Sequence, residues 1–109
     1  MGKVSDFVNS RFGCLTDIRE SVVVLGAGAA VPVLANNPNR FSWTIFNLGA
    51  SIGYVGFTSG VTALNGMQLA ATGGIASSNA VNDGELSCNA IFGIGAGATT
   101  LYIFETIAR

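Results

Sequence analysis

Hydrophobic and polar residues alternate along most of the chain from Ser21 onward, and a period of two is typical of half-buried β-strands. The clearest stretch is FSWTIFN at residues 41–47, in which Phe41, Trp43 and Ile45 share one face. A second alternating stretch, residues 51–58, follows after the short Leu-Gly-Ala segment at 48–50. We therefore predict a β-hairpin over residues 41–58, with a tight turn in its middle.

The same pattern predicts further strands, separated by segments rich in Asn, Asp, Gly and Pro. They lie at residues 21–25, 30–35, 85–94 and 99–107, and a short strand could form at 67–69. Turn signals stand at residues 36–39, 72–74 and 82–84. About seven to nine short strands with turns every 8 to 12 residues or so predict an all-β fold, namely an antiparallel, jelly-roll-like β-sandwich.

Charge divides the chain into two parts. Six of its eleven charged side chains lie in residues 1–20 and five in the rest. We therefore expect an N-terminal arm, residues 1–20, that stays outside the core, and a β-sandwich body, residues 21–109. Two readings of the arm remain open. The spacing of Val4, Phe7, Val8 and Phe12 fits a short helix, and an extended segment that orders against a partner fits equally well.

The low charge of the 109-residue chain limits what its surface can consist of and which partners it can bind. Only 10% of its residues are charged, so its surface is either covered by neighbouring molecules or built from Ser, Thr, Asn and Gly, and both can hold together. A net charge of −1 and a single lysine argue against nucleic-acid binding. Polar and glycine residues interrupt the apolar segments before they could cross a membrane. The start MGKVSD lacks the apolar part of a signal peptide, so we expect assembly in a cytoplasm.

One stretch, VVVLGAGAAVP at residues 22–32, resembles the start of a dinucleotide-binding loop. Val31 before Pro32 does not fit the third glycine position, because a β-branched residue before proline favours extended backbone. No carboxylate occurs between Glu20 and Asp83 to hold a ribose. We therefore interpret the glycines as a turn between two strands and expect no cofactor.

The residues that carry catalysis or bind metals are scarce. The chain has no histidine, and its two cysteines, Cys14 and Cys88, form neither a CxxC motif nor a metal-ligand cluster. In a reducing cytoplasm we expect both to be free thiols, with Cys88 filling the core on a strand. Asp83 and Glu85 could act as a carboxylate pair, but charged residues beside a turn are usually solvated. We expect no catalytic residues and no metal site, and therefore no enzyme activity.

Binding groups are more plentiful than catalytic ones. Most aromatic residues alternate along strands and are expected in the core, although they could instead form a sugar-stacking face. Arg40 is isolated in a long uncharged stretch, so it either extends from the rim of the sheet or pairs with a carboxylate across a subunit contact, which we favour. The candidate interface residues are Phe7, Arg11, Phe12, Arg19 and Arg40.

The run NPNRFSWTIFNLG at residues 37–49, followed by YVGF at 54–57 and NGMQL at 65–69, is similar to small structural proteins of tailed bacteriophages. The resemblance covers about residues 30–107, and the arm departs from that pattern. It implies a virion protein, a capsid decoration or cement protein or another head or tail component, which binds the major capsid protein on the particle surface.

Symmetric clusters, most simply homotrimers at threefold sites of a shell, would cover the charge-poor faces. The alternative from another functional class is a glycan-binding or host-attachment module of a phage tail or head fibre.

Overall fold

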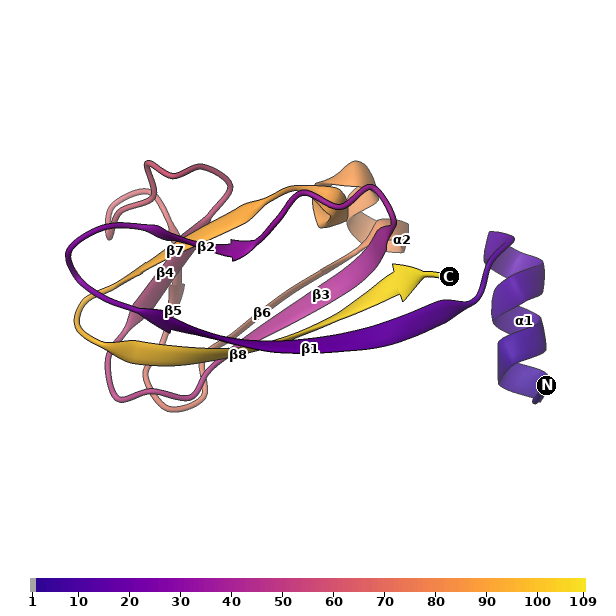
Figure 1. Cartoon of the computed structure of the whole chain (residues 1–109), viewed down its shortest axis with the longest axis horizontal. Helices are drawn as coiled ribbons and strands as arrows, with labels where there is room; N and C mark the ends of the chain where they lie inside the picture. Colours follow the sequence, from indigo (N-terminus) through magenta and orange to yellow (C-terminus); the bar gives the residue numbers. More distant parts are fainter. Residues whose placement is uncertain (1) are drawn as a thin grey trace.

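Two four-stranded antiparallel sheets packed face to face make up the body of the chain in the computed structural model, which describes residues 2–109 (Figure 1). Sheet A has the strand order β1 (Thr16–Leu25), β8 (Thr99–Ala108), β3 (Arg40–Asn47) and β6 (Ile75–Asn79). Sheet B has the order β2 (Val31–Leu34), β7 (Ile91–Gly95), β4 (Gly53–Gly56) and β5 (Met67–Leu69). The helical segments are α1 (Lys3–Phe12), α2 (Ala80–Asp83) and the 3₁₀ helix η1 (Gly84–Cys88).

The connections identify the sandwich as a jelly roll. Consecutive strands alternate between the two sheets, except that β4 and β5 are neighbours in sheet B. The all-β, antiparallel, jelly-roll-like sandwich predicted from the alternating pattern is therefore confirmed, and the turn at residues 72–74 joins β5 to β6 across the sheets.

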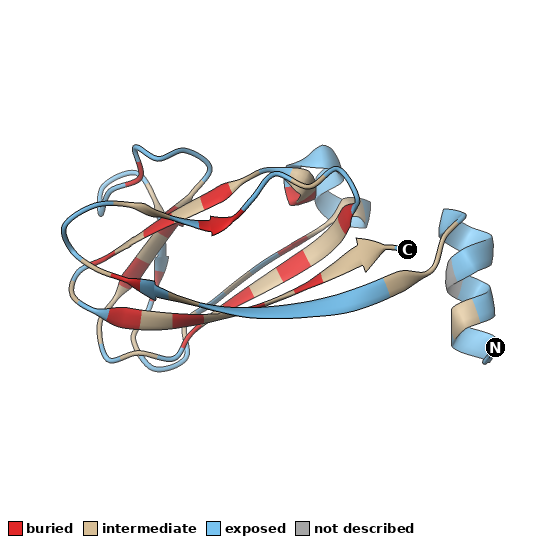
Figure 2. Cartoon of the chain, viewed as in Figure 1, coloured by how far each residue is buried: buried red, intermediate tan, exposed pale blue. Residues whose placement is uncertain are grey.

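The core lies between the sheets and consists of aliphatic side chains and one tryptophan. Figure 2 shows the buried positions as alternating bands along the strands. These positions are Leu25, Val33, Leu34, Trp43, Ile45, Val55, Leu69, Ile91, Leu101 and Ile103. Each fully buried side chain of this size contributes about 1.5–3 kcal/mol, so the contact between the sheets is the main source of stability.

The hairpin predicted over residues 41–58 is wrong. β3 belongs to sheet A and β4 to sheet B, so residues 48–52 carry the chain from one sheet to the other. Both strands have the expected alternation, but alternation does not specify the partner strand. In sheet A, β3 pairs instead with β8 and β6, which lie far from it in sequence.

Asn47 holds this crossing in place with its side chain. Its amide nitrogen donates to the carbonyl oxygens of Ser51 at 2.8 Å and Leu69 at 3.1 Å. Its oxygen accepts from the backbone N–H of Gly49 at 3.1 Å and the Thr99 hydroxyl at 2.7 Å. The side chain is fully buried and both of its polar atoms are used, so it joins three connections at the same end of the sandwich.

Gly49 is required at this crossing because the backbone passes close to β8. A Cβ atom at position 49 would lie 2.0 Å from Thr99 Oγ1 and 2.7 Å from the backbone nitrogen of Thr100. Any larger residue would push the crossing away from β8 and from Asn47.

Two further strand predictions need correction. The strand predicted at residues 85–94 begins only at Ile91, because residues 80–88 form α2 and η1; Cys88 therefore lies at the end of η1 and not on a strand. The first strand begins at Thr16 and not at Ser21, and residues 16–20 pair with residues 104–108 of β8. The boundary expected between arm and body thus falls inside a strand.

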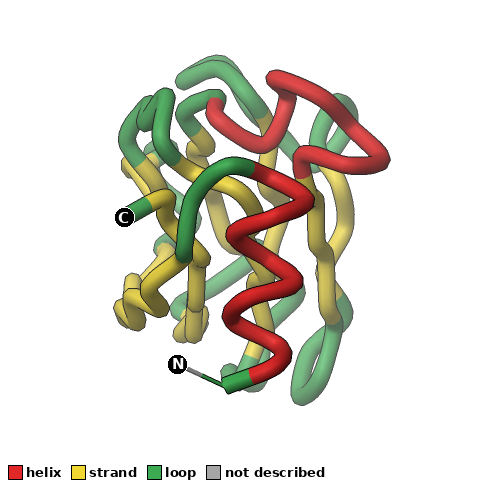
Figure 3. The backbone as a smooth tube through the Cα atoms, turned by 90° about the vertical axis from the view of Figure 1, so that its right-hand side faces the viewer, coloured by secondary structure: helices red, strands yellow, loops and turns green. Residues whose placement is uncertain are grey.

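The segment before β1 forms helix α1, which runs across the direction of β1 (Figure 1) and stands in front of one end of the sandwich (Figure 3). Gly13 ends the helix in a left-handed conformation, with φ 74°, and its N–H donates to the carbonyl of Asn9. The helical alternative for the arm is therefore the correct one. The side chain of Val8 lies outside the described part of the chain.

We expect Asn47→Leu to lower the free energy of unfolding by about 2–4 kcal/mol, because it leaves buried donors and acceptors without partners. Urea unfolding followed by tryptophan fluorescence would measure the change. Asn36→Leu, on the exposed loop after β2, is the control and should change stability by less than about 0.5 kcal/mol. Equal effects of the two substitutions would show that Asn47 does not hold the crossing.

Candidate interaction surface

The outer face of sheet A carries a row of apolar side chains that crosses all four strands. Register pairing places Val22 of β1 beside Tyr102 of β8, Tyr102 beside Phe46 of β3, and Phe46 beside Ile75 of β6. Val22 is 63% exposed and Ile75 58% exposed, while the two aromatic residues between them are half-buried. We call Val22, Tyr102, Phe46 and Ile75 the apolar row.

Three neighbouring aromatic rings form a cluster at the centre of this row. The ring centroids of Phe46 and Tyr102 are 6.0 Å apart, and Phe104 lies 6.0 Å from Phe46 and 6.3 Å from Tyr102. These rings project outward from sheet A, since the residues that alternate with them in β3 and β8 are buried. The expectation that most aromatic residues fill the core is wrong: of the eight aromatic residues that follow α1 in the chain, Trp43 alone is buried.

Glu20 supplies negative charge beside the row. It lies on the same face as Val22, two residues away on β1, and is the register partner of Phe104. The pKa of the Tyr102 hydroxyl is raised, first by desolvation and then by its hydrogen bond to Glu20 and by the charge of that carboxylate. Among the outward positions of the four strands, all within the described residues, Glu20 is the one that is charged.

A groove lies at the other end of the same face, where α1 meets the sheet. Phe12 of α1 packs edge-on against Phe41, with ring centroids 4.8 Å apart and an interplanar angle of 70°. The groove has a volume of about 450 Å³. Its lining combines these two rings with side chains that carry hydroxyl or amide groups, namely Thr16, Ser42, Thr44, Ser77, Ser78, Asn79 and Thr106.

Four of the five candidate interface residues lie on the surface near this end. Phe7 is 65% exposed and Arg11 is also exposed, both on α1, while Phe12 is partly covered by Phe41. Arg19 is exposed on β1, opposite Glu105 of β8. The fold thus brings Phe7, Arg11 and Phe12 together on one helix and leaves Arg19 on a neighbouring strand.

Arg40 lies in the interior, so it matches neither of its two expected positions, at the rim of the sheet or in a pair across a subunit contact. A register shift between Arg40 and Ser42 turns Arg40 inward, where it is 3% exposed. Its Nε lies 2.5 Å from Oε2 of Glu105, a carboxylate of the same chain. The pairing partner that we expected across a subunit contact is therefore intramolecular.

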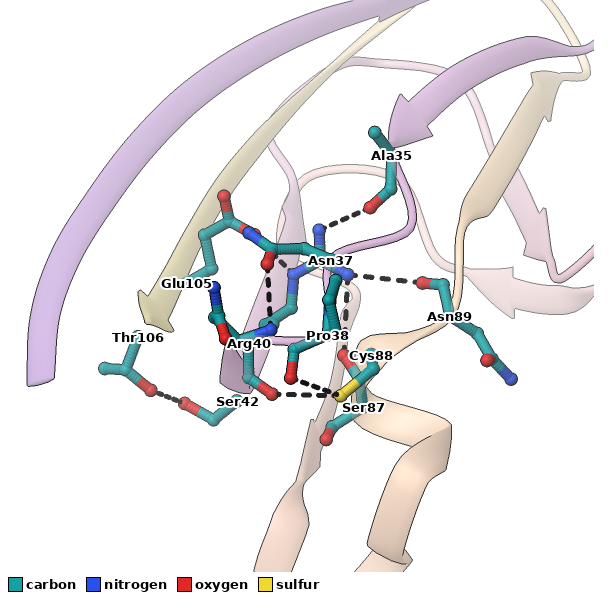
Figure 4. A network of polar contacts seen from close by, with 11 residues as sticks. Ala35, Asn37, Pro38, Arg40, Ser42, Ser87, Cys88, Asn89, Glu105 and Thr106 are labelled. Atoms are coloured by element: carbon teal, nitrogen blue, oxygen red, sulfur yellow. Dashed lines mark hydrogen bonds and ion pairs between the residues drawn. The ribbon is translucent and has the colours of Figure 1, made fainter. Parts of the chain in front are cut away.

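The rest of the Arg40 guanidinium binds three backbone carbonyl groups from two separate segments, as Figure 4 shows. Its Nη2 donates to Ala35 at 2.6 Å, and its Nη1 donates to Asn89 at 3.2 Å and to Ser87 at 3.4 Å. One side chain thus fastens the loop after β2 and the 3₁₀ helix η1 to the start of β3. The network is structural, and it keeps this end of the sandwich closed.

One member of the carboxylate pair suggested by the sequence, Asp83, has a structural role. The Asp83 carboxylate accepts hydrogen bonds from the Ser78 hydroxyl at 2.8 Å and the Asn79 N–H at 3.0 Å. These two bonds lower the pKa of Asp83, so its carboxyl group stays ionised at neutral pH and is a poor proton donor. Glu85 is exposed on η1.

Cys88 remains near the backbone of β3, where its thiol lies 3.4 Å from the carbonyl oxygen of Arg40. Both cysteines are free thiols. Over residues 2–109, no three His, Cys, Asp or Glu side chains gather as metal ligands. None of the helices described is long and apolar enough to span a bilayer.

Comparison with known proteins identifies the fold but no family. No protein-family pattern matches the chain, and no curated protein matches its sequence. Among solved structures, it is similar to dTDP-4-dehydrorhamnose 3,5-epimerase from Bacillus anthracis, with a TM-score of 0.50 and 12% identity over 94% of this chain and 60% of the epimerase. A viral collagen prolyl hydroxylase from Paramecium Bursaria Chlorella virus-1 gives 0.50 and 14%, over 98% and 66%.

The coat protein of Tobacco streak virus is also similar, with a TM-score of 0.38 and 11% identity over 90% of this chain and 88% of the coat protein. At such identities the similarity extends to the jelly-roll sandwich and no further.

We expect Arg40→Met to lower the free energy of unfolding by about 3–5 kcal/mol, because the Glu105 carboxylate is then buried without a partner. Arg40→Lys should recover little of this loss, since an ammonium group cannot replace the guanidinium fork. The matched control is Arg109→Met, which breaks an exposed ion pair with Asp17 at 3.6 Å and should cost less than about 1 kcal/mol. Denaturant titration of the three variants would contradict this account if Arg40→Met and Arg109→Met were equally mild.

Proposed function

We propose that this chain is a structural protein of a phage virion that acts by binding and not by chemistry. In its most specific form, it is a capsid decoration or cement protein that attaches to the major capsid protein and stabilises the head shell. Homotrimers at threefold positions of the shell are the simplest symmetric arrangement of its copies.

The observation that carries this proposal is the apolar row on the outer face of sheet A, in a chain with few charges. Exposed apolar area that continues across a whole sheet favours association with another surface. Between the sheets lie the core side chains and, toward one end, the buried Arg40–Glu105 pair. The similarity of residues 37–69 to small tailed-phage structural proteins supports a virion as the setting, and jelly rolls are common in viral capsids.

The position of α1 supports an anchoring role for the N-terminal segment. The helix contacts sheet A through Phe12, but Val4 is 77% exposed and Phe7 is 65% exposed. A virion subunit gains affinity when many copies bind a symmetric shell together, so a modest contact for each copy is sufficient.

Counting the copies in purified particles tests the proposal. Quantitative mass spectrometry should find this chain in numbers comparable with the major shell protein if it cements the capsid. A few copies for each particle would support an attachment module at a tail or fibre, and its absence from particles would contradict both functions.

Deletion of residues 1–12 should release the protein from particles at a lower temperature than the full chain. The deletion stops before Thr16, because residues 16–20 pair with β8.

The groove at α1 favours a second candidate, a glycan-binding or host-attachment module. Aromatic rings can stack on the C–H faces of a sugar, while hydroxyl and amide groups exchange hydrogen bonds with its hydroxyls. The volume of about 450 Å³ is within the range of small-molecule sites.

If the groove binds sugars, Phe12→Ser should reduce binding to mono- and oligosaccharides at least about tenfold, the equivalent of about 1.4 kcal/mol. Phe57→Ser is a matched control, because Phe57 and Phe12 are both 39% exposed and Phe57 does not line the groove. Heteronuclear NMR titration with a sugar panel would report the affinity and the residues affected. Shifts that avoid Ser42, Thr44 and Thr106 would exclude the groove.

A further inference from the structure

We propose that helix α1 of one copy of this chain lies across the apolar row of a second copy. The contact uses the apolar row and α1, the two surfaces on which the virion proposal rests, and names a second copy as the partner of both. It is tested on the isolated chain, so its failure can be told apart from failure of the virion function. Both halves of the contact are present in every copy, so the contact can be reciprocal within a dimer or repeat around a ring.

The helix offers a stripe of two apolar side chains and one arginine that is largely exposed in its own chain, although Val4 also borders a small hollow with Leu15, Thr16 and Arg109. Val4, Phe7 and Arg11 follow the i, i+3, i+7 spacing that places side chains on one face of a helix. Val4 is 77% exposed and Phe7 65% exposed. Phe12, which packs on Phe41, lies on a different side of the helix, so α1 can keep its place on its own body while the stripe faces outward.

The dimensions of the two surfaces agree. A ten-residue helix is about 15 Å long. Four neighbouring strands spaced by about 4.8 Å place the two ends of the apolar row about 14 Å apart. The row runs across the strands, so a helix that lies along the row contacts all four of its residues, Val22, Tyr102, Phe46 and Ile75.

Charge complementarity sets the direction of the helix. Glu20 is the charged residue on the outer face of sheet A, and it stands beside the β1 end of the row. Arg11, at the C-terminal end of the stripe, can meet it when Val4 lies over Ile75. Asp6 lies on the opposite side of the helix from the stripe, so it does not oppose Glu20.

The helix of the same chain is held away from the row. Val22 lies about 20 Å along β1 from Thr16, where the connection from α1 enters the sheet. The contact between Phe12 and Phe41 keeps α1 at that entry end. A second copy is therefore the occupant that supplies the matching stripe.

The size of the contact predicts weak pairing. A helix about 15 Å long and 10 Å wide covers a footprint of about 150 Å². Stable complexes bury about 800 Å² on each partner, so isolated copies should associate weakly and reversibly, and strongly only when many contacts act together.

The experiment uses the full chain and three substitutions at exposed positions. Phe7→Glu spoils the helix stripe, Val22→Glu spoils the apolar row, and Val81→Glu is the control on α2. Val81 is 62% exposed and Val22 63% exposed, so the two valine substitutions are closely matched. Sedimentation equilibrium should show concentration-dependent association of the unmodified chain that either of the first two variants weakens at least about tenfold and Val81→Glu leaves unchanged. Circular dichroism would confirm that all three variants are folded.

Mixing the two defective variants distinguishes the proposed contact from unspecific aggregation. The Val22→Glu protein keeps an intact helix, and the Phe7→Glu protein keeps an intact row, so the mixture should associate more tightly than either variant alone. With only the Val22→Glu protein labelled with ¹⁵N, its NMR shifts should change in α1; with only the Phe7→Glu protein labelled, they should change around Phe46 and Tyr102.

Exchange of the charges provides a second test. Arg11→Glu should weaken association, and Arg11→Glu combined with Glu20→Arg should restore it.

The proposal is overturned if the unmodified chain stays monomeric up to millimolar concentration, if its association survives both Phe7→Glu and Val22→Glu, or if mixing those two variants does not restore association.

Discussion

The buried ion pair between Arg40 and Glu105 is the interaction on which this end of the sandwich depends. It joins the start of β3 to β8, and the same guanidinium holds the carbonyl groups of Ala35, Ser87 and Asn89. The loop after β2 and the helix η1 have few apolar side chains of their own in the core. The Arg40 guanidinium binds four partners and so fixes the positions of these two segments, which hydrophobic contacts alone would hold weakly. Asn47 has the corresponding role at the far end of β3, where an amide joins three connections.

The sequence predicted the fold class and most strands, because period-two alternation survives wherever one face of a strand is buried. It failed to predict which strands pair. Residues 41–47 and 51–58 alternate equally well, yet residues 48–52 cross between the sheets, and this depends on the bonds of Asn47 with Thr99 and Leu69, distant in sequence. The register shift after Arg40 likewise reversed the expected orientation of that residue. The apolar stretch at residues 85–94 was taken for a strand because alternation cannot detect the short helices that precede Ile91.

The candidate surface was harder to predict than the fold. Phe7, Arg11 and Phe12 could be identified because they are close together in sequence and lie in a charged, polar segment. The apolar row could not, since Val22, Tyr102, Phe46 and Ile75 come from four strands and meet only through register. The alternating aromatic residues were expected in the core, but most of them are not buried. Alternation shows that a strand has two different faces, but it does not show which face is covered by the other sheet. In sheet A, Trp43 and aliphatic side chains face the core, whereas the rings of Phe46, Tyr102 and Phe104 face outward.

The charged residues near the N-terminus have a consequence for solubility that follows from the position of β1. This strand is ten residues long and forms an edge of sheet A, so one side of its backbone is free to pair with an edge strand of another molecule. Asp17, Arg19 and Glu20 are exposed along its first half, and ionised side chains on an edge oppose continuous strand addition. The second half, with Val22 and Val24, has no such protection and is the segment where fibre-like pairing would begin if these copies were crowded. Neighbours that cover it in an assembly would therefore also protect the protein against aggregation.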